Sequence, residues 1–136
     1  MPTGAALWAN RGSIAVGGFL SWLGPFGVAF AFVDRTGHIA VPVELFKSLM
    51  IVIGGAWGCF LLARVFRRCP LTLGTGLSVG VFWLLINGAA DLLVLVPMSH
   101  MSLSMYAMDI GLRYLLIPIF GTTLGIVAER VRTPNA

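Results

Sequence analysis

Four long apolar segments dominate the chain, and most polar residues fall between them. The segments cover roughly Ser13–Val33, Val43–Phe66, Leu71–Val96 and Tyr106–Ala128, and few charges interrupt them. A helix needs about 20 apolar residues to cross the hydrocarbon core of a bilayer, whereas a barrel strand needs only about half that number. The pattern therefore predicts an all-α fold, an integral membrane bundle of four transmembrane helices that forms a single domain over residues 1–136.

The composition agrees with this interpretation and excludes other classes of protein. Hydrophobic residues make up 58% of the 136 residues, charged residues make up 10%, and the mean hydropathy is +0.95. A soluble domain carries about a quarter of its residues as charged ones. A small soluble fold also leaves too much surface exposed to hide so many apolar side chains. We therefore exclude a soluble globular domain and a disordered chain, and we expect the lipid bilayer, not nucleic acid, as a partner.

The basic residues predict how the helices are oriented. With a cytoplasmic N-terminus, the outer loops hold only Arg35, while Lys47 and Arg113 lie just inside the second and fourth helices. The remaining basic residues then all fall on the inner side: Arg11, Arg64, Arg67, Arg68, Arg130 and Arg132. Because lysine and arginine accumulate on the cytoplasmic side, we expect a multi-pass protein of the bacterial inner membrane with both termini cytoplasmic.

The two halves of the chain repeat each other weakly. Residues of the second helix recur at an offset of 66 in the fourth, and residues of the first recur at an offset of 61 in the third. The matched pairs are Lys47 and Arg113, Gly55 and Gly121, Arg64 and Arg130, Trp22 and Trp83, and Gly27 and Gly88. Since each half holds two helices, the repeat predicts two tandem hairpins related by a pseudo-twofold axis along the membrane normal. Chance similarity between two hairpins rich in leucine and glycine is the alternative.

Three pairs of glycines have the spacing that lets helix backbones approach closely. They are Gly54 and Gly58, Gly76 and Gly80, and Gly121 and Gly125. In lipid, close packing of small residues holds helices together. These faces are expected either to pack within the four-helix bundle or to bind a second copy or another membrane protein.

Asp91 is the leading candidate for a functional residue because it lies inside the third predicted helix. An isolated charge at that depth costs several kcal/mol, so a partner is expected. Arg113 lies at a similar depth in the fourth helix, since both residues are one to two turns from the same side. Asp109 precedes Arg113 by one turn and can contact the same guanidinium. We therefore expect a triad of Asp91, Asp109 and Arg113 in the outer leaflet.

The first half holds a reduced version of this triad, with Lys47 in place of Arg113 and Glu44 about one turn before it. Two interpretations are open. Asp91 and Arg113 form an interhelical clamp, or they belong to a polar path or to an anion or proton site. Asn87 lies one turn below Asp91 on the same helix face and would extend such a path inward.

The outer loop before the fourth helix contains soft metal ligands. Met98, His100, Met101 and Met105 lie close together in the sequence, and thioethers with imidazole suit copper(I). Methionine is also a common filler of apolar surfaces, so no metal or cofactor is predicted. The sequence carries no hydrolase, zinc-protease or phosphate-loop motif, and we expect the protein not to be an enzyme.

Residues Asp91–Pro118 follow the pattern D-L-x-x-x-x-P-M…Y-x-x-D-I-G-L-R-Y-L-x-I-P. This stretch resembles small four-helix inner-membrane proteins of bacteria, over the third and fourth helices only. The resemblance implies a compartment and no activity. Two function classes are expected: a homo-oligomeric transporter or channel with a polar site at Asp91 and Arg113, or a non-catalytic accessory or scaffold subunit of a larger membrane complex.

Overall fold

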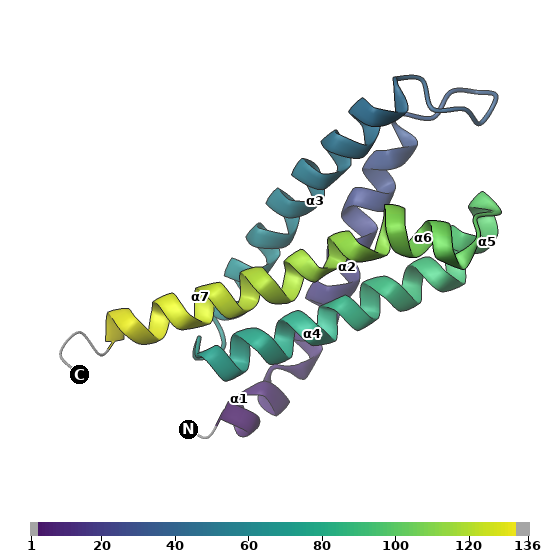
Figure 1. Cartoon of the computed structure of the whole chain (residues 1–136). Helices are drawn as coiled ribbons and strands as arrows, with labels where there is room; N and C mark the ends of the chain where they lie inside the picture. Colours follow the sequence, from purple (N-terminus) through teal and green to yellow (C-terminus); the bar gives the residue numbers. More distant parts are fainter. Residues whose placement is uncertain (1–2, 133–136) are drawn as a thin grey trace.

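The computed structural model describes residues 3–132, and four of its helical segments are long and apolar enough to cross a membrane. They are Arg11–Phe30, Val43–Phe66, Leu73–Ser99 and Gly111–Arg132. Helices α2 (Arg11–Phe30) and α3 (Val43–Phe66) form the first two, and the helical elements follow one another through the described residues without a named strand. The predicted all-α architecture with four spanning-length helices is confirmed (Figure 1).

The third and fourth segments are not regular α-helices. The third consists of α4 (Leu73–Ala90), a π-helical turn (Asp91–Leu95) and α5 (Val96–Ser99). The fourth consists of a 3₁₀ turn (Gly111–Leu115) and α7 (Leu116–Arg132). Two short helices precede spanning segments: α1 (Thr3–Ala9) lies before α2, and α6 (Leu103–Asp109) lies before the 3₁₀ turn.

The first, third and fourth predicted helices differ from the structure at both ends, and the first covers Arg11–Phe30 where Ser13–Val33 was predicted. Two of the other differences have local reasons. The third segment continues through Pro97 to Ser99, because the helix widens into the π-helical turn just before the proline. Proline cannot donate a backbone hydrogen bond, and such a turn accommodates its ring. The fourth predicted helix, from Tyr106, is interrupted at Ile110, whose φ of −127° ends α6. The long helix therefore begins only at Gly111.

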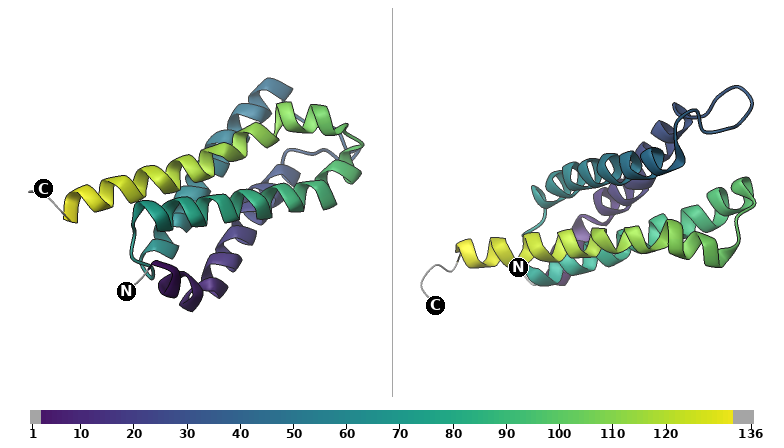
Figure 2. Two further views of the ribbon diagram at one scale, coloured as in Figure 1. Left: turned by 60° about the horizontal axis from the view of Figure 1, so that its bottom comes forward. Right: turned by 45° about the horizontal axis from the view of Figure 1, so that its top comes forward.

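Helices α4 and α7 form the closest pair, and glycines make this possible (Figure 2). A methyl group added to Gly76 would collide with the carbonyl oxygen of Gly121, and one added to Gly125 would lie 2.5 Å from the carbonyl oxygen of Thr72. Gly80 faces the backbone of Pro118 in the same way. Two of the three glycine pairs are thus used within the chain, as close antiparallel packing in a bundle requires.

Helices α2 and α4 are parallel and are joined by a ladder of hydrogen bonds. Each bond links residues 69 apart, and both partners advance by one helical turn from one bond to the next. The bonds run from Trp83 Nε1 to the Ile14 carbonyl (2.8 Å), from Asn87 Nδ2 to the Gly18 carbonyl (3.4 Å), and from Trp22 Nε1 to Asp91 Oδ1 (2.7 Å). A constant offset requires the two helices to run in the same direction, as two tandem hairpins would. The symmetry between the hairpins stays a prediction.

The hydrophobic core lies toward the end of the molecule that holds the first and last described residues. Its centre is Trp83, which is fully buried beside Leu62 and Val79. Methyl groups added to Gly17 and Gly18 would lie 2.7 and 2.8 Å from the Trp83 ring. From this core, the pair α2–α3 diverges from the pair α4–α7 toward the opposite end (Figures 1 and 2). The divergence opens the space described below.

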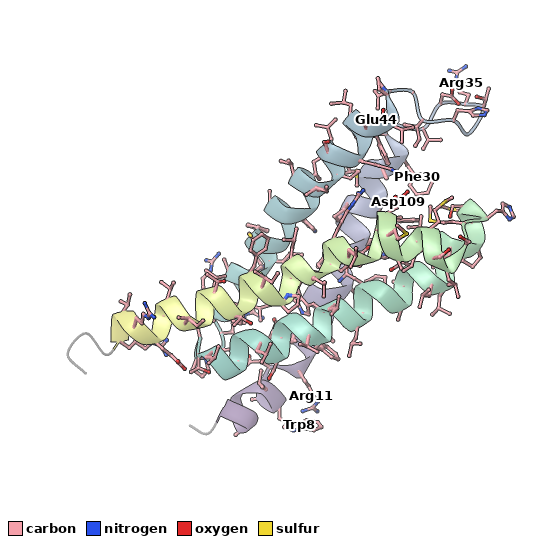
Figure 3. All side chains as sticks on the ribbon, viewed as in Figure 1. Trp8, Arg11, Phe30, Arg35, Glu44 and Asp109 are labelled. Carbon is pink, nitrogen blue, oxygen red and sulfur yellow. The ribbon has the colours of Figure 1, made fainter. Side chains whose placement is uncertain are left out.

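Charged residues lie at both ends of the molecule. Figure 3 places Trp8 and Arg11 at the end near the first residues, and Arg35 and Glu44 at the other. The Arg11 guanidinium lies 5.7 Å from the centre of the Trp8 ring, and Trp8 is 70% exposed. The turn at the opposite end is closed by Asp34, and its hydrogen bonds, first that from the Thr36 side chain, lower the pKa of this carboxyl.

Candidate functional site

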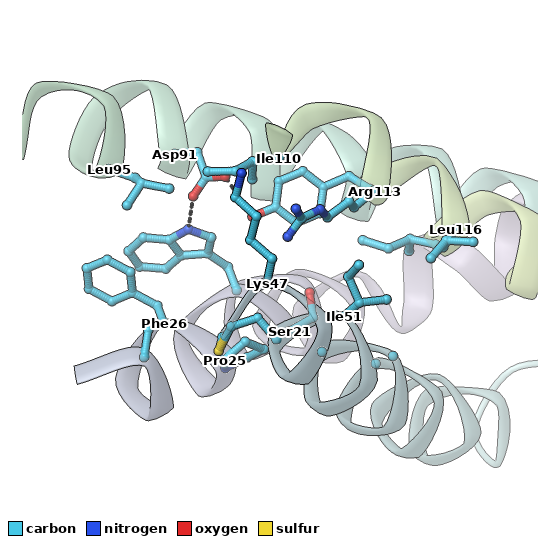
Figure 4. A pocket seen from close by; sticks show the side chains of 18 of the residues that line it. Ser21, Pro25, Phe26, Lys47, Ile51, Asp91, Leu95, Ile110, Arg113 and Leu116 are labelled. Atoms are coloured by element: carbon cyan, nitrogen blue, oxygen red, sulfur yellow. Dashed lines mark hydrogen bonds between the residues drawn. The ribbon is translucent and has the colours of Figure 1, made fainter. Parts of the chain in front are cut away.

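A cavity of about 470 Å³ lies where the two helix pairs diverge (Figure 4). Side chains from α2, α3, α4 and α7 line it, together with the π-helical turn, α6 and the 3₁₀ turn. Its wall is mainly apolar, and its charged residues are Lys47, Asp91, Asp109 and Arg113. A concave, largely apolar space of several hundred Å³ with a few convergent polar groups is typical of a small-molecule site.

Asp91 is almost completely buried, with 1% of its surface exposed, and both of its oxygens accept hydrogen bonds. Trp22 Nε1 donates to Oδ1 and the Tyr114 hydroxyl donates to Oδ2, each over 2.7 Å. Arg113 forms no ion pair with Asp91 among residues 3–132. The predicted Asp91–Arg113 pair is therefore wrong, because two neutral aromatic donors occupy the carboxylate instead.

The sequence pattern does not indicate Trp22 and Tyr114 as the partners of Asp91, because neither residue carries a charge. Buried tryptophan and tyrosine also need acceptors for their N–H and O–H groups. Trp22 on α2 and Tyr114, the immediate neighbour of Arg113, both satisfy that need at Asp91. The π-helical turn begins at Asp91, so the irregular backbone coincides with the buried acid.

Asp109 pairs with Lys47 across the two hairpins and not with Arg113. Lys47 Nζ lies 3.0 Å from Asp109 Oδ2, and the two side chains are 40% and 39% exposed. An i, i+4 contact needs a continuous α-helix, and the break at Ile110 removes it. Lys47 likewise does not pair with Glu44, which is exposed at the start of α3. Both predicted local pairs are replaced by one long-range pair.

Arg113 is a cation of the cavity that has no ion-pair or hydrogen-bond partner in the part of the chain that the structure describes. Among residues 3–132, no acid forms an ion pair with its guanidinium and no acceptor forms a hydrogen bond with it. Its side chain is half-buried and lines the cavity, as does that of Lys47 (Figure 4). The sequence repeat matches these two residues, and the structure brings both to the same cavity.

Asn87 belongs to the contact between α2 and α4 and does not line the cavity. Its side chain is 1% exposed, and its amide donates to Ser21 Oγ and to the Trp83 carbonyl, each over 2.8 Å. Thr123 on α7 donates to the Ile119 carbonyl of its own helix. The expected extension of the polar site through Asn87 is therefore not formed.

The third glycine pair faces the cavity. A methyl group added to Gly58 or to its neighbour Gly55 would meet nothing within 4 Å, and one added to Gly54 would meet only Pro25 at 3.8 Å. All three glycines line the cavity. Unlike the other two pairs, this one leaves open space beside α3.

The candidate copper ligands Met98, His100, Met101 and Met105 lie in α5, in the turn after it and in α6. Met98 and Met105 are 52% and 54% exposed, and His100 adopts a left-handed backbone conformation with φ of 53°. Met101 lines the cavity. In the described part of the chain, no group of three histidine, cysteine or acidic residues is placed to hold a metal ion. Copper(I) binding at these residues, the alternative that the sequence does not favour, is not tested by this arrangement.

Tyr106, in α6, adds a second hydroxyl near Asp91. It is buried, and burial raises the pKa of its hydroxyl well above the usual value, with a further contribution from Asp91. The hydroxyl therefore stays protonated near neutral pH. Neutral donors from Trp22 and Tyr114 satisfy both oxygens of Asp91, which lets its carboxylate remain in a buried position.

Comparisons with protein-family models, curated proteins and solved structures found no match to this chain. The resemblance to four-helix inner-membrane proteins of bacteria therefore stays a prediction.

Proposed function

We propose that this protein is a small polytopic transporter of the bacterial inner membrane that binds an anionic solute in the cavity between its two helix pairs. Both termini are proposed to be cytoplasmic, which places the charged end of the cavity in the outer leaflet. The protein is not proposed to be an enzyme.

The unpartnered guanidinium of Arg113 is the observation that carries this proposal. A charge among membrane-spanning helices is expensive unless it is paired or hydrated, and such residues commonly mark substrate paths. Arg113 points into a cavity and has no acceptor among residues 3–132. An anionic group bound in the cavity would supply the missing partner.

The buried polar residues support the cavity without binding the solute. Asp91 links α2 to the fourth segment through Trp22 and Tyr114. Asn87 links α2 to α4 one turn lower. These hydrogen bonds set the spacing of the walls, so the clamp interpretation applies to Asp91 and Asn87, and the functional interpretation applies to Arg113.

Irregular helices flank the candidate site on both sides. The π-helical turn carries Asp91, and the 3₁₀ turn carries Arg113 and Tyr114. Non-α turns inside long helices are frequent at functional sites, and broken helices form the substrate sites of many transporters. The packed core around Trp83 closes the other end of the space. A carrier that changes conformation fits this geometry better than an open channel does, and assembly into a homo-oligomer remains part of the proposal.

An accessory or scaffold subunit is the second candidate. Large apolar side chains on α3 point outward, with Val52 68% and Phe60 50% exposed. Lipid or a partner helix would cover them. Because Gly76, Gly80, Gly121 and Gly125 are used within the chain, only the Gly54–Gly58 face is left for a partner helix of this kind.

Charge movement in proteoliposomes tests the proposal. A potassium gradient with valinomycin sets a membrane potential, and an oxonol dye reports how fast chloride, acetate, phosphate or dodecyl phosphate dissipates it. At least one anion is expected to dissipate the potential faster with the wild-type protein than with Arg113→Gln. Arg35→Gln, in the exposed turn between α2 and α3, is the matched control and should behave as wild type. Equal rates for the wild type, Arg113→Gln and empty vesicles would reject transport.

Native mass spectrometry separates the two function classes. A discrete homo-oligomer or monomer that retains a small molecule supports the transporter. A chain that is always released together with a second protein supports the accessory subunit.

A further inference from the structure

We infer that the ligand of this cavity is a single-chain anionic amphiphile, such as an alkyl carboxylate or alkyl phosphate, that enters from the bilayer between α3 and α7. The inference rests on the proposed function, because it uses the same cavity, and it specifies the chemical class of the solute.

The cavity is elongated, and one stripe of α3 shows its direction. Lys47, Ile51, Gly54, Gly58 and Leu62 all line it at spacings of three or four residues, so they follow one face of the helix. From Lys47 to Leu62 this stripe spans roughly 22 Å at 1.5 Å per residue. The stripe starts with a cation and ends at the hydrophobic core, where Leu62 is 1% exposed.

The fourth spanning segment shows the same order, from a cation to apolar residues, on the facing wall of the cavity. Arg113 is followed along the cavity by Ile117 and Phe120, three or four residues apart. Both walls therefore present a cation at the outer end and apolar groups further in. The complementary molecule has an anionic head and an apolar chain.

The head-group end holds two cations and two acids, and both acids already have partners. A guanidinium binds carboxylate or phosphate oxygens in a bidentate manner, and Arg113 has no acceptor among residues 3–132. Both oxygens of Asp91 are already bound by neutral donors. The ion pair of Lys47 with Asp109 is partly exposed, so the ammonium group can also turn toward a bound anion.

The end of the cavity that would hold the alkyl chain has space, because α3 carries glycines where it faces the cavity. Side chains at Gly55 and Gly58 would meet nothing within 4 Å, so the floor of the cavity is left open beside the helix backbone. The charged residues lie at the outer end, and the rest of the lining is largely apolar. A hydrated, chainless anion would leave this apolar part of the cavity unfilled.

One side of the cavity is bounded by α3 and α7, which belong to two of the spanning segments. Ile51 on α3 is 41% exposed and Leu116 on α7 is 36% exposed, and both line the cavity. Ile51 lies about 12 Å along α3 from its first residue, which places it at the depth of acyl chains in a spanning orientation. A molecule already dissolved in the bilayer can therefore enter sideways.

Fluorescence quenching in lipid nanodiscs tests this inference. Trp22 and Trp83 line the cavity, so dodecyl phosphate with bromine at the end of its chain should quench tryptophan fluorescence saturably. Dodecyltrimethylammonium with the same bromine label, at the same mole fraction, should give only the linear quenching of a freely diffusing lipid. Excess methyl phosphate should not displace the alkyl phosphate. Equal saturable quenching by the cationic analogue, or full displacement by methyl phosphate, would overturn the inference.

Substitutions at the two ends of the cavity test which end binds the anionic head group and which end binds the alkyl chain. Arg113→Gln should weaken dodecyl phosphate binding about tenfold or more, as loss of a charge-assisted hydrogen bond implies. Gly58→Leu fills the end of the cavity that holds the alkyl chain and should weaken the binding of dodecyl phosphate more than that of hexyl phosphate, with both compared at the same mole fraction in the lipid. Gly27→Leu, at an exposed position of α2 with open space around it, is the matched control. Unchanged binding in both Arg113→Gln and Gly58→Leu would overturn the inference even if the wild type binds.

The binding test and the transport test can each fail without the other. Saturable binding without faster dissipation of the potential supports the amphiphile site and rejects the transporter. Transport of chloride or acetate without saturable binding of dodecyl phosphate supports the transporter and rejects the amphiphile. The melting temperature of each variant shows whether a loss of binding arises from unfolding.

Discussion

Trp22 donates its indole N–H to Asp91 over 2.7 Å. Counted along α2, this bond is the last of three that join α2 to the third spanning segment at a constant offset of 69 residues. It links a residue of the first spanning segment to the start of the π-helical turn in the third. The same carboxylate accepts from Tyr114 of the fourth segment. One buried acid thus connects three spanning segments beside the cavity.

Removing either donor to Asp91 should destabilise the fold. Trp22→Phe and Tyr114→Phe keep an aromatic ring but leave one carboxylate oxygen without its partner, at an expected cost of about 1–2 kcal/mol each. Asp91→Asn should also destabilise the protein, because the Asn oxygen can accept from Trp22 but its N–H₂ then faces Tyr114, whose O–H loses its acceptor. Unfolding titrations with dodecyl sulfate in detergent micelles measure these changes. A Trp22→Phe variant as stable as the wild type would contradict the importance of this bond.

Glycines that look alike in the sequence should respond differently to alanine. Gly76→Ala places a methyl group against the Gly121 carbonyl and should lose about 1–3 kcal/mol through overpacking. Gly55→Ala meets open space and should be neutral or stabilising by up to about 1 kcal/mol, since alanine favours helix. Thermal unfolding followed by circular dichroism checks both. Equal destabilisation by the two substitutions would show that α3 also packs closely at Gly55, where this structure has open space.

The ion pair of Lys47 and Asp109 should contribute little to stability. Although its N–O distance is 3.0 Å, both side chains are about 40% exposed, and such pairs are worth up to about 1 kcal/mol. Lys47→Gln and Asp109→Asn should therefore shift the melting temperature far less than Tyr114→Phe does. A double-mutant cycle on the two residues measures the coupling directly. A coupling larger than that of Asp91 with Trp22 would reverse this ranking.

The orientation of the chain can be read from cysteine accessibility. In a variant with Cys59 and Cys69 changed to alanine, Thr36→Cys in the turn after α2 should react with a membrane-impermeant maleimide added to intact cells. Arg67→Cys, at the end of α3, should react only after the cells are permeabilised. The opposite pattern would place the termini outside and would move the charged end of the cavity to the cytoplasmic leaflet.

Some features of the fold were predictable because they depend on local sequence alone. The length of each apolar run predicted four spanning helices, and α3 matches its predicted bounds of Val43–Phe66. The depth of Asp91 correctly predicted that it is buried and partnered. The glycine spacing predicted close packing, which Gly76 and Gly121 confirm.

The choice of partners required the tertiary structure. Which donor reaches Asp91 depends on how three helices are rotated about their axes, and a single residue step exchanges Arg113 for Tyr114. The π-helical turn before Pro97 and the break at Ile110 change those rotations. Hydropathy sums side-chain properties along the chain and contains no information about rotation. The four helices therefore follow from the sequence, while the cavity, and an Arg113 guanidinium with no acceptor among residues 3–132, follow from how the helices pack.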